Sequence, residues 1–182
     1  MSAGKTTAAR IVIRMLKREG VRVVGAKISG AGRYRDILTM GDAGADAIFD
    51  FMDAGLPSTV CPPEVYRDAL RGLLARMQAE EADVAVVESG ASPLEPYNGA
   101  IAVKKIRHAV ECTVLASSDP YAVVGVMEAF DARPDLVTGI ASNTRAGIDL
   151  TEALTGIRTL NVRDKASRPA LRELLERTLG PG

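Results

Sequence analysis

Ser2-Ala3-Gly4-Lys5-Thr6-Thr7 stands near the beginning of the chain and is followed at once by a helical pattern. Apolar residues recur at helical spacing through residues 6–19, and Gly20 supplies a stop for that helix. A glycine, a lysine and a hydroxyl residue at the point where a helix begins are typical of a loop that binds phosphate. In such a loop the backbone N–H groups and the helix N-terminus hold the phosphate oxygens.

The full pattern of this phosphate-binding loop, or P-loop, is G-x-x-x-x-G-K-[ST], and it gives each residue a role. Lys5 is expected to reach the β- and γ-phosphate oxygens, and the Thr6 hydroxyl to ligate Mg²⁺. The first glycine of the pattern would lie before Met1, as would the strand that normally precedes the loop. We therefore expect Met1 to be a loop residue of a longer chain, so that the sequence lacks the first strand and the start of the P-loop.

Short and nearly continuous apolar segments along the chain predict strands that are buried on both faces. They cover residues 21–27, 83–88, 112–116 and 136–140, with a further candidate at 158–162. Helical patterns alternate with them, at residues 62–81, about 98–109, 120–130, 148–154 and 168–179. This alternation predicts a parallel sheet with helices on both faces, in a single α/β domain over residues 1–182.

The composition excludes several classes of protein. Lys plus Arg and Asp plus Glu both number 23, and such a neutral chain lacks the electrostatic footprint of a nucleic-acid binder. The two cysteines, Cys61 and Cys112, have no spacing typical of a disulfide framework or a zinc site. No apolar run approaches the roughly 18 residues of a membrane span. We therefore expect a cytoplasmic protein whose partners include neither nucleic acid nor membrane.

Three polar residues end strand-like segments, where α/β proteins usually bind ligands. Lys27 is either a functional cation or an exposed residue at the end of its strand. Glu88 follows a run of Val and Ala, where a carboxylate needs a cation or hydrogen-bond donors, and beside a P-loop Mg²⁺ is the natural partner. Asn143 either reads a nucleotide base or forms a turn.

Residues 29–57 are rich in glycine and aspartate and show few strand signals. A long connection that leaves the carboxyl end of a parallel strand often handles the ligand. Asp42, Asp46 and Asp50 follow one another at a spacing of four, which predicts one solvated helix face. One of the aspartates of this segment could instead supply a second contact to Mg²⁺.

From Ser2 to about Asn161 the sequence resembles the P-loop family that contains dethiobiotin synthetase and the cobyrinic acid amide synthetases. Four stretches carry the resemblance in order: Ser2-Ala-Gly-Lys-Thr-Thr7, Gly25-Ala-Lys-Ile-Ser-Gly30, Val86-Val-Glu-Ser-Gly-Ala91 and Gly139-Ile-Ala-Ser-Asn143. The second stretch departs from the family's pattern at Ile28 and Ser29, and the third at Ser89. The resemblance implies a three-layer P-loop NTPase fold, mostly parallel, with helices on both faces.

The resemblance also implies roles for individual residues. Nucleotide binding falls to Ser2, Ala3, Gly4, Lys5, Thr6, Thr7 and, at the adenine edge, Asn143. Lys27 would contact the substrate side of the γ-phosphate, so that Lys5 and Lys27 are the expected catalytic residues. Thr6 and Glu88 would bind Mg²⁺ together with an aspartate at Asp42 or Asp46, and we place it at Asp42.

The implied function is that of an enzyme, an ATP-dependent ligase or synthetase that activates a carboxylate or carbamate by phosphoryl transfer. Its cofactors would be ATP and Mg²⁺, its substrate a small carboxylate or amine, and its assembly a homodimer. The alternative is a nucleotide-dependent switch or assembly NTPase of the metallochaperone or partitioning type. The lack of an N-K-x-D motif at Asn143 disfavours guanine, and Met1 and Ser2 stand where a partitioning ATPase has paired glycines.

Overall fold

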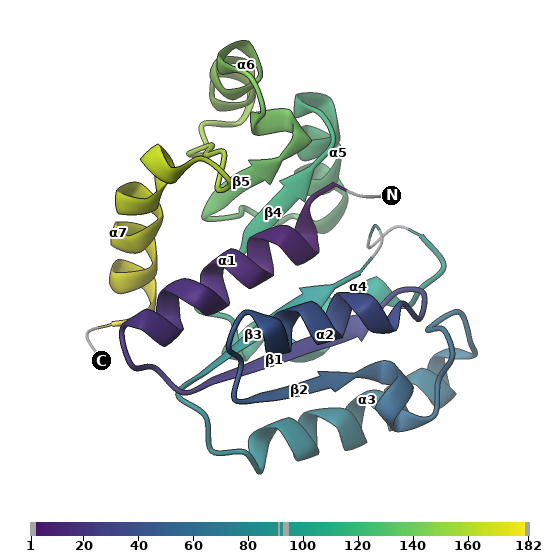
Figure 1. Cartoon of the computed structure of the whole chain (residues 1–182). Coiled ribbons are helices and arrows are strands. Elements are labelled where there is room, and N and C mark those ends of the chain that lie inside the picture. Colours follow the sequence, from purple (N-terminus) through teal and green to yellow (C-terminus); the bar gives the residue numbers. More distant parts are fainter. Residues whose placement is uncertain (1–2, 91, 93–94, 181–182) are drawn as a thin grey trace. The chain divides into compact units, whose positions relative to one another are not determined.

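The computed structural model describes residues 3–90, 92 and 95–180 (Figure 1). The chain divides into two compact units. Unit 1 comprises Met1–Ala8 and Val110–Gly182, and unit 2 comprises Ala9–Ala109. Helix α1 (Lys5–Arg18) therefore begins in unit 1 and continues in unit 2. The assignment of residues 1–182 to a single domain stays a prediction.

Unit 2 is built on a parallel sheet of three strands in the order β2-β1-β3. These strands are β1 (Val23–Ser29), β2 (Ala47–Asp50) and β3 (Val84–Ser89). Helix α2 (Tyr34–Asp42) connects β1 to β2, α3 (Pro63–Gln78) connects β2 to β3, and α4 (Gly99–Ile106) follows β3. The described part of unit 2 also contains most of α1 and the 3-10 helices η1 (Phe51–Ala54) and η2 (Arg107–Ala109).

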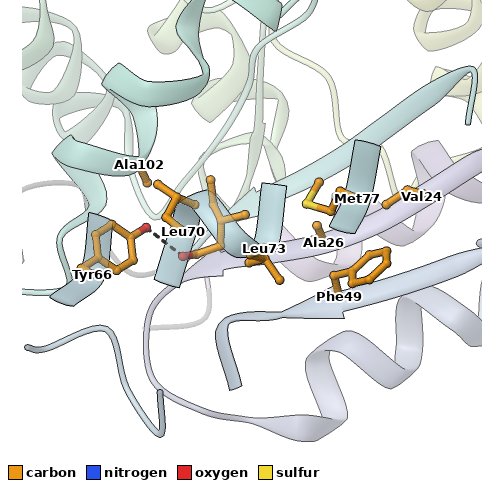
Figure 2. Packing of buried hydrophobic residues seen from close by; sticks show 9 residues of the cluster. Val24, Ala26, Phe49, Tyr66, Leu70, Leu73, Met77 and Ala102 are labelled. Atoms are coloured by element: carbon orange, nitrogen blue, oxygen red, sulfur yellow. Dashed lines mark hydrogen bonds between the residues drawn. The ribbon is translucent and has the colours of Figure 1, made fainter. Parts of the chain in front are cut away.

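Helices cover both faces of this sheet. On one face the apolar residues of β1 and β2 pack against α3 and α4 (Figure 2), in a core of Val24, Ala26, Ile28, Phe49, Tyr66, Leu70, Leu73, Met77 and Ala102. The Tyr66 hydroxyl is buried there and donates to the Ile28 carbonyl oxygen at 2.8 Å. On the other face α2 lies close to β1, since a Cβ on Gly25 would stand 3.0 Å from that of Met40. The alternation of side chains along β1 therefore directs Gly25 and Lys27 toward the α2 face.

Unit 1 contains a parallel pair of strands, β4 (Val114–Ser117) and β5 (Leu136–Gly139). Its helices are α5 (Pro120–Phe130), α6 (Arg145–Thr155) and α7 (Arg168–Leu179), with the 3-10 helices η3 (Ile140–Ser142) and η4 (Lys165–Ser167). Val123 of α5 packs with Val137 and Ile157 in a small core. Helix α5 begins as its sequence predicts, with Asp119 as the N-cap and Pro120 in the first turn.

The parallel α/β class is confirmed, but residues 29–57 and 158–162 differ from the prediction. The segment 29–57 contains α2 and the four-residue strand β2, both too short to give a clear periodic signal. Within 158–162 only Thr159 forms an isolated bridge, to Val137. Among the helices of residues 3–90, 92 and 95–180, none combines the length and the apolar character that a bilayer span requires.

The prediction that three aspartates share one helix face is wrong. Asp42 is the last residue of α2, Asp46 precedes β2, and Asp50 ends β2. Gly44, whose φ is 106°, takes a left-handed backbone conformation that ends the helical path between Asp42 and Asp46. The spacing of four residues therefore spans a helix end, a turn and a strand.

Candidate functional site

The segment Gly4-Lys5-Thr6 forms the start of α1 in unit 1. Gly4 has a φ of 104°, which favours glycine, and its carbonyl oxygen accepts the Ala8 N–H at 2.9 Å to close the first helical turn. Lys5 and Thr6 are the first two residues of the helix and are half-buried. The N–H groups of a first helical turn have no partner within the helix, so this turn can bind an anion. Ser2, which the sequence also assigns to the loop, lies outside the described residues.

The backbone before α1 lies against the carboxyl end of β5. A Cβ on Gly139 would overlap the Ala3 carbonyl oxygen and would stand 2.7 Å from that of Ser117. Gly139 has φ 94° and ψ −154°, a conformation that is essentially restricted to glycine. The absence of a side chain at Gly139 thus allows the P-loop segment to approach the ends of β4 and β5.

Asn143 stands four residues beyond Gly139, at the end of η3, and is exposed. Its backbone N–H donates to the Ile140 carbonyl oxygen at 3.0 Å. The next helix is capped by Thr144, whose hydroxyl accepts the Gly147 N–H at 3.1 Å. The turn thus uses the backbone N–H of Asn143 and the side chain of Thr144. The side chain of Asn143 is not part of the turn, and the residue is exposed.

A row of charged side chains crosses the carboxyl ends of the three strands in unit 2. In strand register Lys27 pairs with Asp50 on one side and with Glu88 on the other. Residues in register project to the same face of a sheet, here the face of α2. All three are buried, with exposed fractions of 4% for Lys27, 1% for Asp50 and 6% for Glu88. Charged side chains that are buried in this way need partners, so the folded chain must supply them at this edge of the sheet.

Lys27 is held in place on several sides. Its Nζ donates to Asp36 Oδ2 at 2.7 Å and to the Ala31 carbonyl oxygen at 3.2 Å. Its stem passes between two glycines, since a Cβ on Gly90 would stand 3.3 Å from Lys27 Cε and one on Gly30 would stand 3.6 Å away. Lys27 is therefore a buried cation with an ionic partner. The alternative that it is an exposed residue at the end of its strand is wrong.

The structure favours Asp36 over Asp42 and Asp46 as the aspartate of this site. Asp36 lies in the first turn of α2 and pairs with Lys27. Asp42 is exposed at the other end of α2, which returns the chain to the amino end of β2. Asp46 also lies at the amino end, where the hydrogen bond from Lys17 and that from the Val23 N–H lower its pKa. Both sequence candidates thus stand at the opposite end of the strands from Lys27 and Glu88.

Asp50 has a local structural role at the end of β2. Its Oδ1 accepts the Met52 N–H at 3.2 Å, and its own N–H donates to Asp53 Oδ2 at 2.8 Å. These two bonds form a capping box that begins η1. Burial raises the pKa of the Asp50 carboxyl, against the Met52 N–H and the Lys27 ammonium, which lower it.

A hydrogen-bond network that the sequence did not reveal ties the loops at this edge together. The buried Thr59 hydroxyl accepts the Gly30 N–H at 2.9 Å and donates to the Tyr97 carbonyl oxygen at 2.6 Å. The Asn98 side chain donates to the carbonyl oxygens of Thr59 and Cys61, at 2.8 and 2.9 Å. Thr59 thereby links the loop after β1 to the loop after β3. Its sequence context, Pro57-Ser58-Thr59, carries only the signal of a turn.

Replacing Thr59 by valine is expected to destabilise the chain by about 2 kcal/mol, because the buried Gly30 N–H loses its acceptor. Valine has the shape of threonine, so packing changes little and the loss reports the hydroxyl. The free energy of unfolding in urea measures the effect. The reverse exchange at the neighbouring Val60, which is 53% exposed, should change that free energy by less than about 0.5 kcal/mol. Equal stability of Thr59→Val and the unchanged chain would contradict the role given to the network.

Within residues 3–90, 92 and 95–180, no three His, Cys, Asp or Glu side chains gather as a metal site would require. A magnesium ion at this edge would therefore need oxygen ligands from elsewhere, such as a hydroxyl group, water or a nucleotide phosphate. Glu88 suits such a site chemically, because it is a carboxylate at the carboxyl end of a strand.

Searches against protein-family models and against curated proteins find no match. Among solved structures, the chain is similar to the 54 kDa signal recognition particle protein from Aeropyrum pernix K1, which was solved in complex with GDP. The TM-score is 0.53 and the sequence identity 22%, over 98% of this chain and 47% of that chain. The chain thus spans about half the length of that protein, and the likeness concerns the fold. Together with the segment Gly4-Lys5-Thr6 at the start of α1, it shows that the chain has an α/β fold of the P-loop NTPase kind.

Proposed function

We propose that the chain binds a nucleoside triphosphate with Mg²⁺ through residues 3–7. The start of α1 carries this proposal, because a positive-φ glycine there precedes a lysine and two threonines in the first helical turn. The N–H groups of that turn suit the phosphate oxygens, and the Lys5 ammonium suits the β- and γ-phosphates. The similar fold of a protein solved with GDP supports the same function.

For the chemistry, the proposal is an ATP-dependent ligase or synthetase that acts on a small carboxylate or carbamate. An oxygen of the substrate would bond to the γ-phosphorus while the bond to the β,γ-bridging oxygen breaks, so that ADP leaves. Lys5 would neutralise charge on the transferring group, which is the main demand of phosphoryl transfer, and a part for Lys27 stays a prediction from the sequence. The burial and fixed position of Lys27 at a strand end support its part in this step.

In this proposal the Thr6 hydroxyl would hold Mg²⁺, and Mg²⁺ binding by Glu88 stays a prediction from the sequence. When bound, the ion supplies positive charge to the phosphate oxygens. Oxygen ligands are the kind that Mg²⁺ prefers, and each of these side chains offers one. Asn143 would hydrogen-bond the base, for which its exposed amide is available.

A second candidate is a nucleotide-dependent switch, and one observation favours it. The solved structure with the similar fold belongs to a signal recognition particle protein and contains GDP. A switch would hydrolyse its nucleotide only when a protein partner is present, whereas a ligase would respond to a small substrate.

Titration of the 182-residue chain with ATP and with GTP tests the proposal. We expect ATP to bind at least ten times more tightly than GTP, and more tightly with Mg²⁺ than with EDTA. ADP release is then measured against a panel of carboxylates and against diamines with bicarbonate, where one class should stimulate it. Preference for GTP without stimulation by any small molecule would favour the switch. Failure of both nucleotides to bind, with the chain folded by circular dichroism, would overturn the proposal.

A further inference from the structure

Unit 1 contains a cavity of about 380 Å³ that the proposed nucleotide site does not use. It lies at the carboxyl-terminal ends of α5 and α6, which pack against each other. Helix α5 ends just before β5 begins, whereas the backbone before Lys5 lies against Gly139 at the other end of β5. The cavity and the start of α1 thus stand at opposite ends of one strand. Sites for small molecules have volumes from about 300 Å³ upward, so this cavity is large enough for a ligand.

Part of the cavity lining is apolar. It consists of Val124 and Met127 from α5 and Leu154 from α6. Leu154 is 46% exposed, and the other two side chains are half-buried. A ligand with an apolar stem would remove this surface from water, which is favourable.

The lining also carries the carboxylates of Glu128 and Asp131. Both residues are exposed, and within residues 3–90, 92 and 95–180 neither forms an ion pair. They stand at the carboxyl end of α5, where the helix dipole and the carbonyl groups of the last turn already concentrate negative charge. The last turns of α5 and α6 contain no basic residue. The cavity therefore favours a cation.

Asp131 takes a backbone conformation that is unfavourable for its residue type. It caps α5 with φ 45° and ψ 47°, in the left-handed region. Helix α6 ends in the same region, but there the residue is Gly156, which adopts it at the least cost. At Asp131 the chain thus accepts an unfavourable conformation together with a carboxylate at the negative end of a helix. Strain of this kind is common where a protein holds a ligand.

The chain itself places a guanidinium group at the end of α6. Arg133 lines the cavity, and its Nη2 donates to the Gly156 carbonyl oxygen at 3.3 Å. A second guanidinium would suit the two carboxylates at the end of α5, because it is weakly hydrated and can donate two parallel hydrogen bonds. A metal ion fits less well, since the described residues provide no group of three ligands.

We propose that this cavity binds an organic cation, a guanidinium group carried on an apolar stem. The guanidinium would donate to the carboxylates of Glu128 and Asp131. The stem would lie against Val124, Met127 and Leu154. A free small molecule and an arginine side chain of a partner protein present this same chemistry. The site is separate from the nucleotide site and does not depend on the proposed function.

The test uses N-butylguanidinium as the probe and N-butylurea as its neutral counterpart of similar shape. Each is titrated into the 182-residue chain at pH 7 and low salt, while nuclear magnetic resonance follows the backbone amides of Asp131 and Leu154. We expect butylguanidinium to shift both signals saturably, with a Kd of about 1 mM, because the carboxylates are exposed to water. Butylurea should leave both signals unchanged. Equal responses to the two probes, or no saturation by butylguanidinium, would overturn the inference.

The Asp131→Gly variant separates binding from stability. It removes one carboxylate and gives the left-handed position to glycine, so it should melt at a higher temperature than the unchanged chain. It should nevertheless bind butylguanidinium at least about five times more weakly, because one charge-assisted hydrogen bond is lost. Glu176→Gln, which removes an exposed carboxylate from α7 of the same unit, is the matched control and should bind it within about twofold. Equal binding by Asp131→Gly and the unchanged chain would contradict the proposed site.

A short peptide distinguishes the two sources of the guanidinium group. The probe is an alanine-arginine-alanine tripeptide with both ends blocked. Tighter binding of the tripeptide than of butylguanidinium would assign the cavity to an arginine of a partner protein, and weaker binding to a free small molecule. Asp131→Gly should bind ATP as the unchanged chain does. Loss of ATP binding in the unchanged chain would remove the proposed function and leave this inference standing.

Discussion

A Lys5→Ala chain is expected to bind ATP about a hundred times more weakly than the unchanged chain, a loss of about 3 kcal/mol. The Lys5 ammonium stands in the first turn of α1 and is half-buried, so its bond to a phosphate oxygen would be poorly screened by water. Without it, the phosphates would retain only the N–H groups of the turn. Isothermal titration with ATP and Mg²⁺ measures the difference.

Lys17→Ala is the control for the loss of one positive charge from the same helix. Lys17 stands in the last turn of α1, half-buried, where it pairs with Asp46. Its removal should change ATP affinity by less than about twofold, because an isolated ion pair near the surface contributes little. Equal affinities of Lys5→Ala and Lys17→Ala for ATP would show that the P-loop assignment is wrong.

Gly139→Ala is expected to destabilise unit 1 by about 3 kcal/mol, because it combines a clash with backbone strain. The new Cβ would overlap the Ala3 carbonyl oxygen, and neither group belongs to a side chain that could rotate away. The φ and ψ of Gly139 are also unfavourable for any residue with a Cβ. Thermal unfolding followed by circular dichroism measures the loss. Nucleotide affinity should fall as well, since relief of the clash would displace the backbone before Lys5.

Gly125→Ala provides the matched control within unit 1. Gly125 lies inside α5, and a Cβ there would meet no atom within 4 Å. Alanine should stabilise the helix by up to about 1 kcal/mol, because glycine is the poorer helix former. An unchanged melting temperature for Gly139→Ala would show that Ala3 can move away from Gly139 at no cost.

Much of the fold could be predicted from local patterns in the sequence. The run of Val and Ala before Glu88 predicts β3, and apolar residues at helical spacing predict α3. Prediction failed at β2, whose four residues Ala47–Asp50 are too few for a periodic signal. Its place in the sheet depends on pairing with β1, which local sequence does not encode.

The candidate site likewise contains some residues that could be predicted from the sequence and others that could not. Gly4, Lys5 and Thr6 could be found because they are consecutive and a helix follows them. Asp36 could not be chosen among its neighbouring aspartates, since the choice depends on where α2 begins and in which direction it runs. Thr59 was missed because its partners, Gly30 and Tyr97, lie 29 and 38 residues away in the sequence.

The charged row also has a consequence for how the sheet of unit 2 assembles. A shift of β2 by a single residue against β1 would exchange the two faces of its side chains. Asp50 would then enter the apolar layer beside Tyr66 and Leu70, and Phe49 would leave it. Misaligned sheets are penalised by the burial of a charge as well as by the loss of apolar contacts. The charged row of unit 2 thus helps to select the correct alignment of the strands during folding.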